Sequence, residues 1–97
     1  MIVSFGNRAT EDLFNGISSS RARKLPNQIR EAALYKLDVL NAVQSLEELK
    51  SPPGNRLEAL RGDLAGQHSI RINTQWRIVF RWKESNAHEV QIIDYHR

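Results

Sequence analysis

The sequence predicts an α+β fold: an N-terminal strand and two helices, followed by a four-strand antiparallel meander with the helices packed on one sheet face. Three observations support this prediction. Apolar residues recur at helical spacing between residues 26 and 43, and they alternate with polar residues over much of residues 57–82. Short turn-forming sequences separate the alternating segments, which favours antiparallel pairing of neighbours. Helices grouped before the strands, rather than alternating with them, indicate the α+β class.

Composition limits the classes of protein. The 97 residues are enough for a single domain, which we expect to span residues 1–97. The chain carries 14 Lys and Arg against 11 Asp and Glu, a net charge of +3 that favours an anionic partner. It has no cysteine, which excludes disulfides and thiolate metal sites. The first residues lack a long apolar stretch, so we expect a cytoplasmic protein that does not contact a membrane.

The N-terminal region predicts a strand and a short helix. Residues 1–5 are mostly apolar and are closed by a glycine, as in a short strand. Asn7 is a suitable cap for a following helix, with Glu11 and Asp12 in its first turn, where the helix dipole favours acids. The next segment, 18–24, is polar and basic without an apolar period. We expect a mobile solvated connection there, or a basic flap that orders on a polyanion.

The second helix is the most strongly predicted element. Pro26 suits its first turn, and it should run to about Val43 and pack on the sheet. Its buried stripe comprises Ile29, Ala33, Leu37 and Leu40. Residues 51–55, with two prolines, then interrupt regular structure between the helices and the sheet.

The sequence predicts four strands. The first three are centred on Leu60, Ile70 and Ile78, and the fourth spans residues 88–95. Turns at 62–66, 73–74 and 85–86 join them. Alternation gives the sheet two chemically different faces. The helix-facing side should carry Ile70, Ile72, Trp76, Ile78, Phe80 and Trp82. The open side should carry Arg61, Arg71, Arg77 and Arg81. A sheet floor with several arginines is suited to an anionic ligand.

Four segments together resemble the HigB-like branch of the RelE/ParE toxin superfamily, the plasmid maintenance killer proteins. They are SPPGNRLEAL at 51–60, GQHSIRIN at 66–73, QWRIVFRW at 75–82 and DYH at 94–96. The resemblance implies a RelE-like fold and a toxin of a type II toxin–antitoxin system. Such a toxin pairs with a HigA-like helix-turn-helix antitoxin, and it meets operator DNA only through that antitoxin.

The resemblance also implies an activity and its residues. Most such toxins are metal-independent endoribonucleases that cut mRNA on the ribosome and inhibit translation. Their basic residue before the first hairpin loop matches Arg61, their second arginine matches Arg77, and their C-terminal aromatic matches Tyr95, with His96 beside it. Some relatives have a histidine and a lysine where this chain has Glu58 and Arg61. That departure leaves the proton-transfer assignment open.

Chemistry narrows the roles. Arginine stays protonated, so Arg61 and Arg77 can stabilise a phosphate but are poor bases. The titrating candidates nearby are Tyr95 and His96, with Glu58 and Asp94 as further proton-transfer candidates. We assign RNA binding to three further arginines, Arg56, Arg71 and Arg81.

Neither a metal nor a cofactor is expected, because the three histidines, at 68, 88 and 96, lack metal-ligand spacing. Two alternatives to the nuclease stay open: a ParE-like poison of DNA gyrase, and a basic protein that binds ribosomal RNA without cleaving it.

Overall fold

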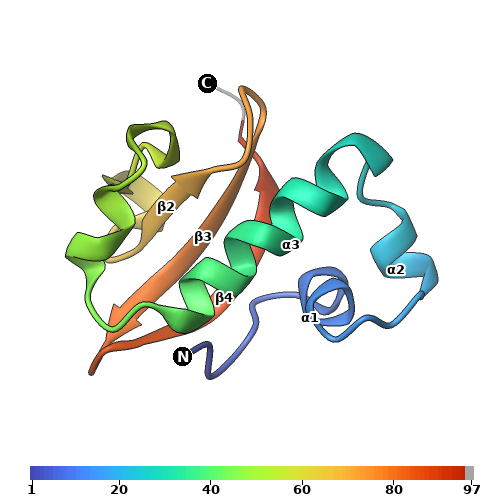
Figure 1. Cartoon of the computed structure of the whole chain (residues 1–97), viewed down its shortest axis with the longest axis horizontal. Helices are drawn as coiled ribbons and strands as arrows, with labels where there is room; N and C mark the ends of the chain where they lie inside the picture. Colours follow the sequence, from blue (N-terminus) through green and yellow to red (C-terminus); the bar gives the residue numbers. More distant parts are fainter. Residues whose placement is uncertain (96–97) are drawn as a thin grey trace.

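The computed structural model describes residues 1–95, which form an α+β domain with one four-stranded antiparallel sheet (Figure 1). The strands follow one another in the order β1 Glu58–Ala59, β2 His68–Arg71, β3 Trp76–Lys83 and β4 Asn86–Asp94. The helices are α1 Arg8–Phe14, α2 Ser20–Arg23 and α3 Asn27–Ala42, and 3₁₀ turns span Leu46–Lys50, Pro53–Asn55 and Gly62–Leu64. The predicted meander is therefore confirmed, with three helices in place of two. None of the helices in the described part is long and apolar enough to cross a bilayer.

The core lies between α3 and one face of the sheet. All four residues of the predicted stripe are buried: Ile29, Ala33, Leu37 and Leu40. They belong to one cluster with the buried side chains of Ile70, Ile78 and Phe80. Figure 1 shows α3 lying across β3 and β4. Because Leu37 and Leu40 are fully buried, replacing either by alanine should cost about 2–5 kcal/mol of folding free energy.

The N-terminal segment lies along the free edge of β4, but it is not a continuous strand. It makes isolated parallel bridges from Ile2 to Ala87 and from Phe5 to Val90. Gly6 then passes so close to β4 that an added Cβ would lie 2.9 Å from the Glu89 carbonyl oxygen. The segment covers the edge of the sheet, as the sequence predicted, with fewer ladder hydrogen bonds than a strand would make.

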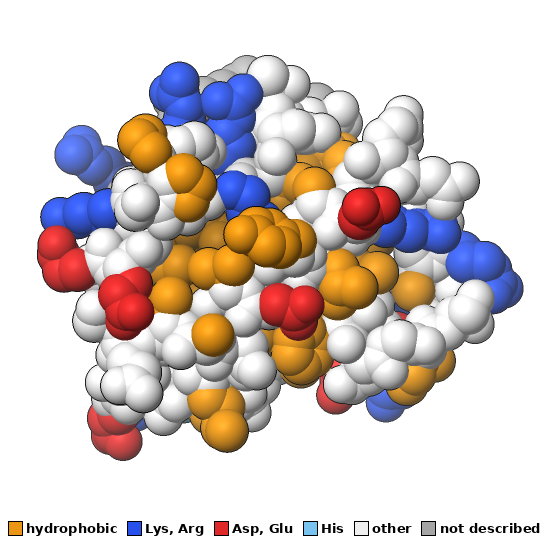
Figure 2. All heavy atoms as spheres, viewed as in Figure 1, with side chains coloured by type: hydrophobic (Ala, Val, Ile, Leu, Met, Phe, Trp, Pro, Cys, Tyr) orange, Lys and Arg blue, Asp and Glu red, His pale blue; other side chains and the backbone are white. Residues whose placement is uncertain are grey.

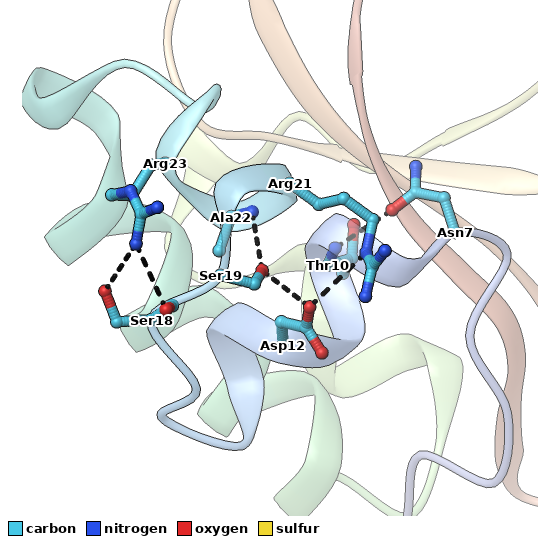
Figure 3. A network of polar contacts seen from close by, with 8 residues as sticks. All are labelled: Asn7, Thr10, Asp12, Ser18, Ser19, Arg21, Ala22 and Arg23. Carbon is cyan, nitrogen blue, oxygen red and sulfur yellow. Dashed lines mark hydrogen bonds and ion pairs between the residues drawn. The ribbon is translucent and has the colours of Figure 1, made fainter.

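Helix α1 begins as predicted, because the Asn7 side chain accepts a hydrogen bond from the Thr10 amide at 2.9 Å. The Thr10 hydroxyl accepts from the Ile92 amide, also at 2.9 Å, and so attaches α1 to β4. Asp12 was expected to interact with the helix dipole. It is buried instead and points toward the following segment (Figure 3).

Within the segment 18–24, residues 20–23 form helix α2, so the predicted loop was wrong, although most of the segment is exposed to solvent. Ser19 caps helix α2, and its hydroxyl donates to the Asp12 carboxylate at 2.6 Å. The Arg21 guanidinium lies 3.6 Å from the same carboxylate oxygen (Figure 3). The buried acid supplies an acceptor that orders this basic stretch, and periodicity within the stretch itself cannot show that partner.

A bulge interrupts the pairing of β3 with β4. The register shifts between Val79 and Arg81, and Glu89 adopts a positive φ of 54°. The extra residue changes the alternation, so that Ala87 and Val90 are both buried although they are three residues apart. The bulge keeps Val90 and Ile92 in the core and leaves the end of β4 in register with β3 at Arg77 and Ile93.

Candidate active site

A hollow of about 880 Å³ lies where the loop before β1, the β2–β3 turn and the end of β4 meet. Its volume is in the range of pockets that hold small organic ligands. On the face that carries α3, hydrophobic side chains occupy much of the middle of the view, and most Lys and Arg side chains lie toward its margins (Figure 2). The hollow is lined by Arg56, Leu57, Glu58, Arg71, Asn73, Thr74, Gln75, Arg77 and Tyr95.

Arg77 is the fixed cation of the hollow. Pairing places it directly opposite Arg71, on the sheet face that does not carry the Ile70 and Ile78 side chains. Its Nε donates to the Ser69 hydroxyl at 2.8 Å and its Nη2 to the Arg56 carbonyl at 2.6 Å. Its Nη1 lies 3.2 Å from the Glu58 carboxylate. Arg77 is 7% exposed, and these three partners fix the position of its positive charge.

Tyr95 lies against this cation. The Arg77 guanidinium carbon is 5.3 Å from the centre of the Tyr95 ring, a cation–π arrangement. The Tyr95 amide donates to the Gln75 carbonyl at 2.7 Å, which extends the pairing one residue beyond β4. The phenol is thereby held beside Arg77, as the predicted face assignment required.

A second hollow of about 480 Å³ adjoins the first. It is lined by Glu58, Ala59, Leu60, Arg61 and Tyr95. Glu58 and Tyr95 therefore line both hollows, and Glu58 is the one acid among the residues that line either. Arg61 is exposed just before the 3₁₀ turn at Gly62–Leu64, rather than on the face of β1 where the sequence placed it.

The remaining predicted site residues divide into two groups. Arg56 and Arg71 line the larger hollow with Arg77. Arg81 lines neither hollow, and its Nε is 3.0 Å from the Glu89 carboxylate at the bulge. Asp94 lies outside both linings, and its carboxylate accepts a hydrogen bond from the Gln75 side-chain Nε2 at 3.0 Å. His96 lies outside the described residues.

The predicted open face is partly closed. Arg77 is buried and Val79 is fully buried on the face expected to be solvated. The sequence reasoning also missed the partners that hold Arg77, the Ser69 hydroxyl and the Arg56 carbonyl. A serine on the strand next to an arginine-bearing strand only weakly indicates a hydrogen bond to the arginine. A main-chain carbonyl acceptor cannot be recognised from the sequence at all. Within residues 1–95, no cluster of three or more His, Asp or Glu side chains could hold a metal ion.

Comparisons with known proteins identify the family of the chain. Residues 4–96 match the family described as a RelE-like toxin of the type II toxin–antitoxin system HigB. The chain is 38% identical over 87 residues to Toxin HigB-1 of Vibrio cholerae serotype O1, an alignment that covers 90% of each. It is 29% identical over 97 residues to Endoribonuclease HigB of Proteus vulgaris, with 99% of this chain and 100% of that protein covered.

Solved structures show a similar fold at low identity. The YoeB–YefM complex from Staphylococcus aureus contains a chain that matches with a TM-score of 0.59 and 13% identity, covering 100% of this chain and 99% of that one. The YoeB/ParE toxin from Agrobacterium tumefaciens matches with a TM-score of 0.54 and 19% identity, covering 99% and 100%. These similarities concern the arrangement of helices and strands.

Proposed function

The chain belongs to the HigB-like family of RelE-like toxins of type II toxin–antitoxin systems, and we propose that it is an endoribonuclease that cleaves mRNA on the ribosome in the cytoplasm. Its partner is then a HigA-like helix-turn-helix antitoxin that holds it inactive. The Proteus vulgaris relative carries the name of an endoribonuclease.

The observation that carries the proposal is the convergence of cations, an acid and a phenol on one hollow. Arg71 and Arg77 are directly opposite each other in the sheet, where like charges are unfavourable. Glu58 offsets part of this positive charge, and a phosphodiester bound beside the two arginines would offset the rest and accept hydrogen bonds from guanidinium groups. Arginines aimed at a phosphate also stabilise the charge that develops there during cleavage, which is often the largest catalytic contribution.

The roles follow from position. Glu58 lies at the junction of the two hollows, where its carboxylate can take the proton from a ribose 2′-hydroxyl. The 2′-oxygen then bonds to phosphorus, and the bond from phosphorus to the 5′-oxygen breaks. The leaving oxygen receives a proton from an acid, for which Tyr95 and His96 are the candidates. Arg77 compensates the phosphate charge, while Arg56, Arg61 and Arg71 hold the RNA backbone.

Mapping of message ends after brief expression tests the proposal. New ends within codons, by primer extension, are the expected result. Uncut message with accumulating protein-linked DNA would instead identify a gyrase poison, and translation arrest with intact message and intact DNA would identify a non-cleaving RNA binder. The double variant Arg77→Ala, Tyr95→Phe should produce no ends while it still binds the antitoxin, and full toxicity of that variant would contradict the assignment.

A further inference from the structure

We infer that the turn Pro53–Asn55, through the buried amide of Asn55 and the left-handed backbone of Arg56, positions the guanidinium of Arg77. The inference rests on the proposed function in one respect: it treats Arg77 as part of the nuclease site. Asn55 does not line the hollow, and the Arg56 carbonyl is occupied by Arg77, so we treat both as positioning elements.

Asn55 fixes the turn. Its side chain is 2% exposed, and its amide nitrogen donates to the carbonyls of Leu49 at 3.1 Å and Ser51 at 3.3 Å. Its amide oxygen accepts a hydrogen bond from the Lys36 ammonium on α3. A carboxylate at this position could still pair with Lys36, but it would have no donor for the two carbonyls.

The Lys36 ammonium, which donates this hydrogen bond to Asn55, is partly buried. Burial lowers the pKa of the Lys36 ammonium, which is the direction expected when a charged group is desolvated. A hydrogen bond from an ammonium is stronger in such surroundings than in water. The turn is therefore anchored to the central helix of the core.

Arg56 follows the anchor in a strained conformation. Its φ of 44° and ψ of 56° lie in the left-handed region, which residues other than glycine seldom adopt. Its side chain is exposed, so side-chain packing does not explain the conformation. Its amide donates to the Pro53 carbonyl at 3.1 Å, and its carbonyl accepts from Arg77 at 2.6 Å. Strained backbone of this kind is often concentrated at functional sites.

These contacts form one chain from the core to the site. Lys36 holds Asn55, Asn55 holds the turn, and the turn aims the Arg56 carbonyl at Nη2 of Arg77. Ser69 holds the Nε side of the same guanidinium from β2. If the carbonyl moved, Arg77 would lose one of the acceptors that place its charge beside Glu58 and Tyr95.

Two substitutions at Arg56 separate its side chain from its backbone. Arg56→Gly and Arg56→Val both remove the cation, but only the β-branched residue opposes the left-handed conformation. We expect both variants to raise KM for RNA equally, whereas Arg56→Val alone should lower kcat by roughly tenfold or more. Equal kcat values in the two variants would overturn the inference. The position is exposed, so both variants should fold.

A second measurement is independent of cleavage. Hydrogen exchange of the Arg77 Nε–H, followed by NMR in the protein without RNA, reports how firmly the guanidinium is held. Exchange should be roughly tenfold faster in Arg56→Val and Asn55→Asp, and unchanged in Arg56→Gly. Unchanged exchange in both of the first two variants would refute the positioning. Faster exchange with wild-type cleavage would support the positioning and refute the nuclease role of Arg77.

Discussion

Replacing Glu58 by glutamine should separate catalysis from stability. Glu58 pairs with Arg77 at 3.2 Å, and the two side chains are 34% and 8% exposed, so removing the charge of this half-buried pair should cost about 1–3 kcal/mol of folding free energy. Arg77 keeps its hydrogen bonds to Ser69 and to the Arg56 carbonyl in the variant. The midpoint of denaturant unfolding should therefore fall modestly, and the variant should still fold.

The effect on cleavage should be much larger. Loss of a general base lowers rates by about 10²–10⁴-fold, which corresponds to about 2.7–5.4 kcal/mol of transition-state stabilisation. Glu89→Gln is the matched control, because Glu89 also pairs with an arginine of β3, Arg81, at 3.0 Å but lines neither hollow. Because that pair is more exposed, with side-chain exposures of 57% and 44%, Glu89→Gln should cost less stability than Glu58→Gln, and it should leave cleavage unchanged.

The assay is single-turnover cleavage of a defined message on purified ribosomes with each variant in excess. The expected order is wild type equal to Glu89→Gln, with Glu58→Gln slower by at least about 10². Cleavage by Glu58→Gln within about threefold of the wild-type rate would refute the role of Glu58 as base. An equally large loss of cleavage in Glu89→Gln would show that the rate depends on ion pairs of the sheet in general and not on a role of Glu58 in the hollow.

Three further predictions concern other parts of the molecule. Arg71→Gln should weaken RNA binding and flatten its salt dependence, measured by titration at several salt concentrations, whereas Arg81→Gln should do neither because Arg81 lies outside the hollows. Asp12→Ala should destabilise the protein by about 1–3 kcal/mol in urea unfolding without slowing cleavage, because it leaves the Ser19 hydroxyl and Arg21 without their acceptor; an unchanged midpoint would show that α2 is ordered by other contacts. Backbone hydrogen bonds from Gln44 and Ser45 lower the pKa of Glu48. The stability that its capping box contributes should therefore be present above the pKa of the unfolded state and be lost as the pH falls through the lower pKa of the folded state. Glu48→Gln should accordingly lose less stability than wild type between about pH 5 and pH 3.

Elements governed by periodicity were predictable from the sequence. The stripe from Ile29 to Leu40 repeats at helical spacing and is buried as expected. Alternation placed Ile70, Ile78 and Phe80 correctly on the core face of β2 and β3, although Val79 and Arg77 on the opposite face are also buried. In both cases the signal is local, since a helix or strand has a fixed repeat and one side must be buried.

Features that depend on a distant partner were not predictable. Helix α2 is ordered by Asp12 of the preceding helix, and the bulge at Glu89 depends on how β4 meets β3 and the N-terminal segment. Dependence on distant partners also limited how much of the candidate site could be predicted. That Arg71, Arg77 and Tyr95 share a region follows from alternation, but the burial of Arg77 depends on a carbonyl from a turn that the sequence showed only as irregular.

The most direct test of the proposed chemistry is cleavage of a message with a single 2′-deoxynucleotide at the mapped scissile position. Attack by the 2′-hydroxyl predicts that this message stays intact at that position, while the all-ribose message is cut to a 2′,3′-cyclic phosphate and a 5′-hydroxyl end. Cleavage of the deoxy-substituted message at the same position, or products that carry a 5′-phosphate, would contradict the account.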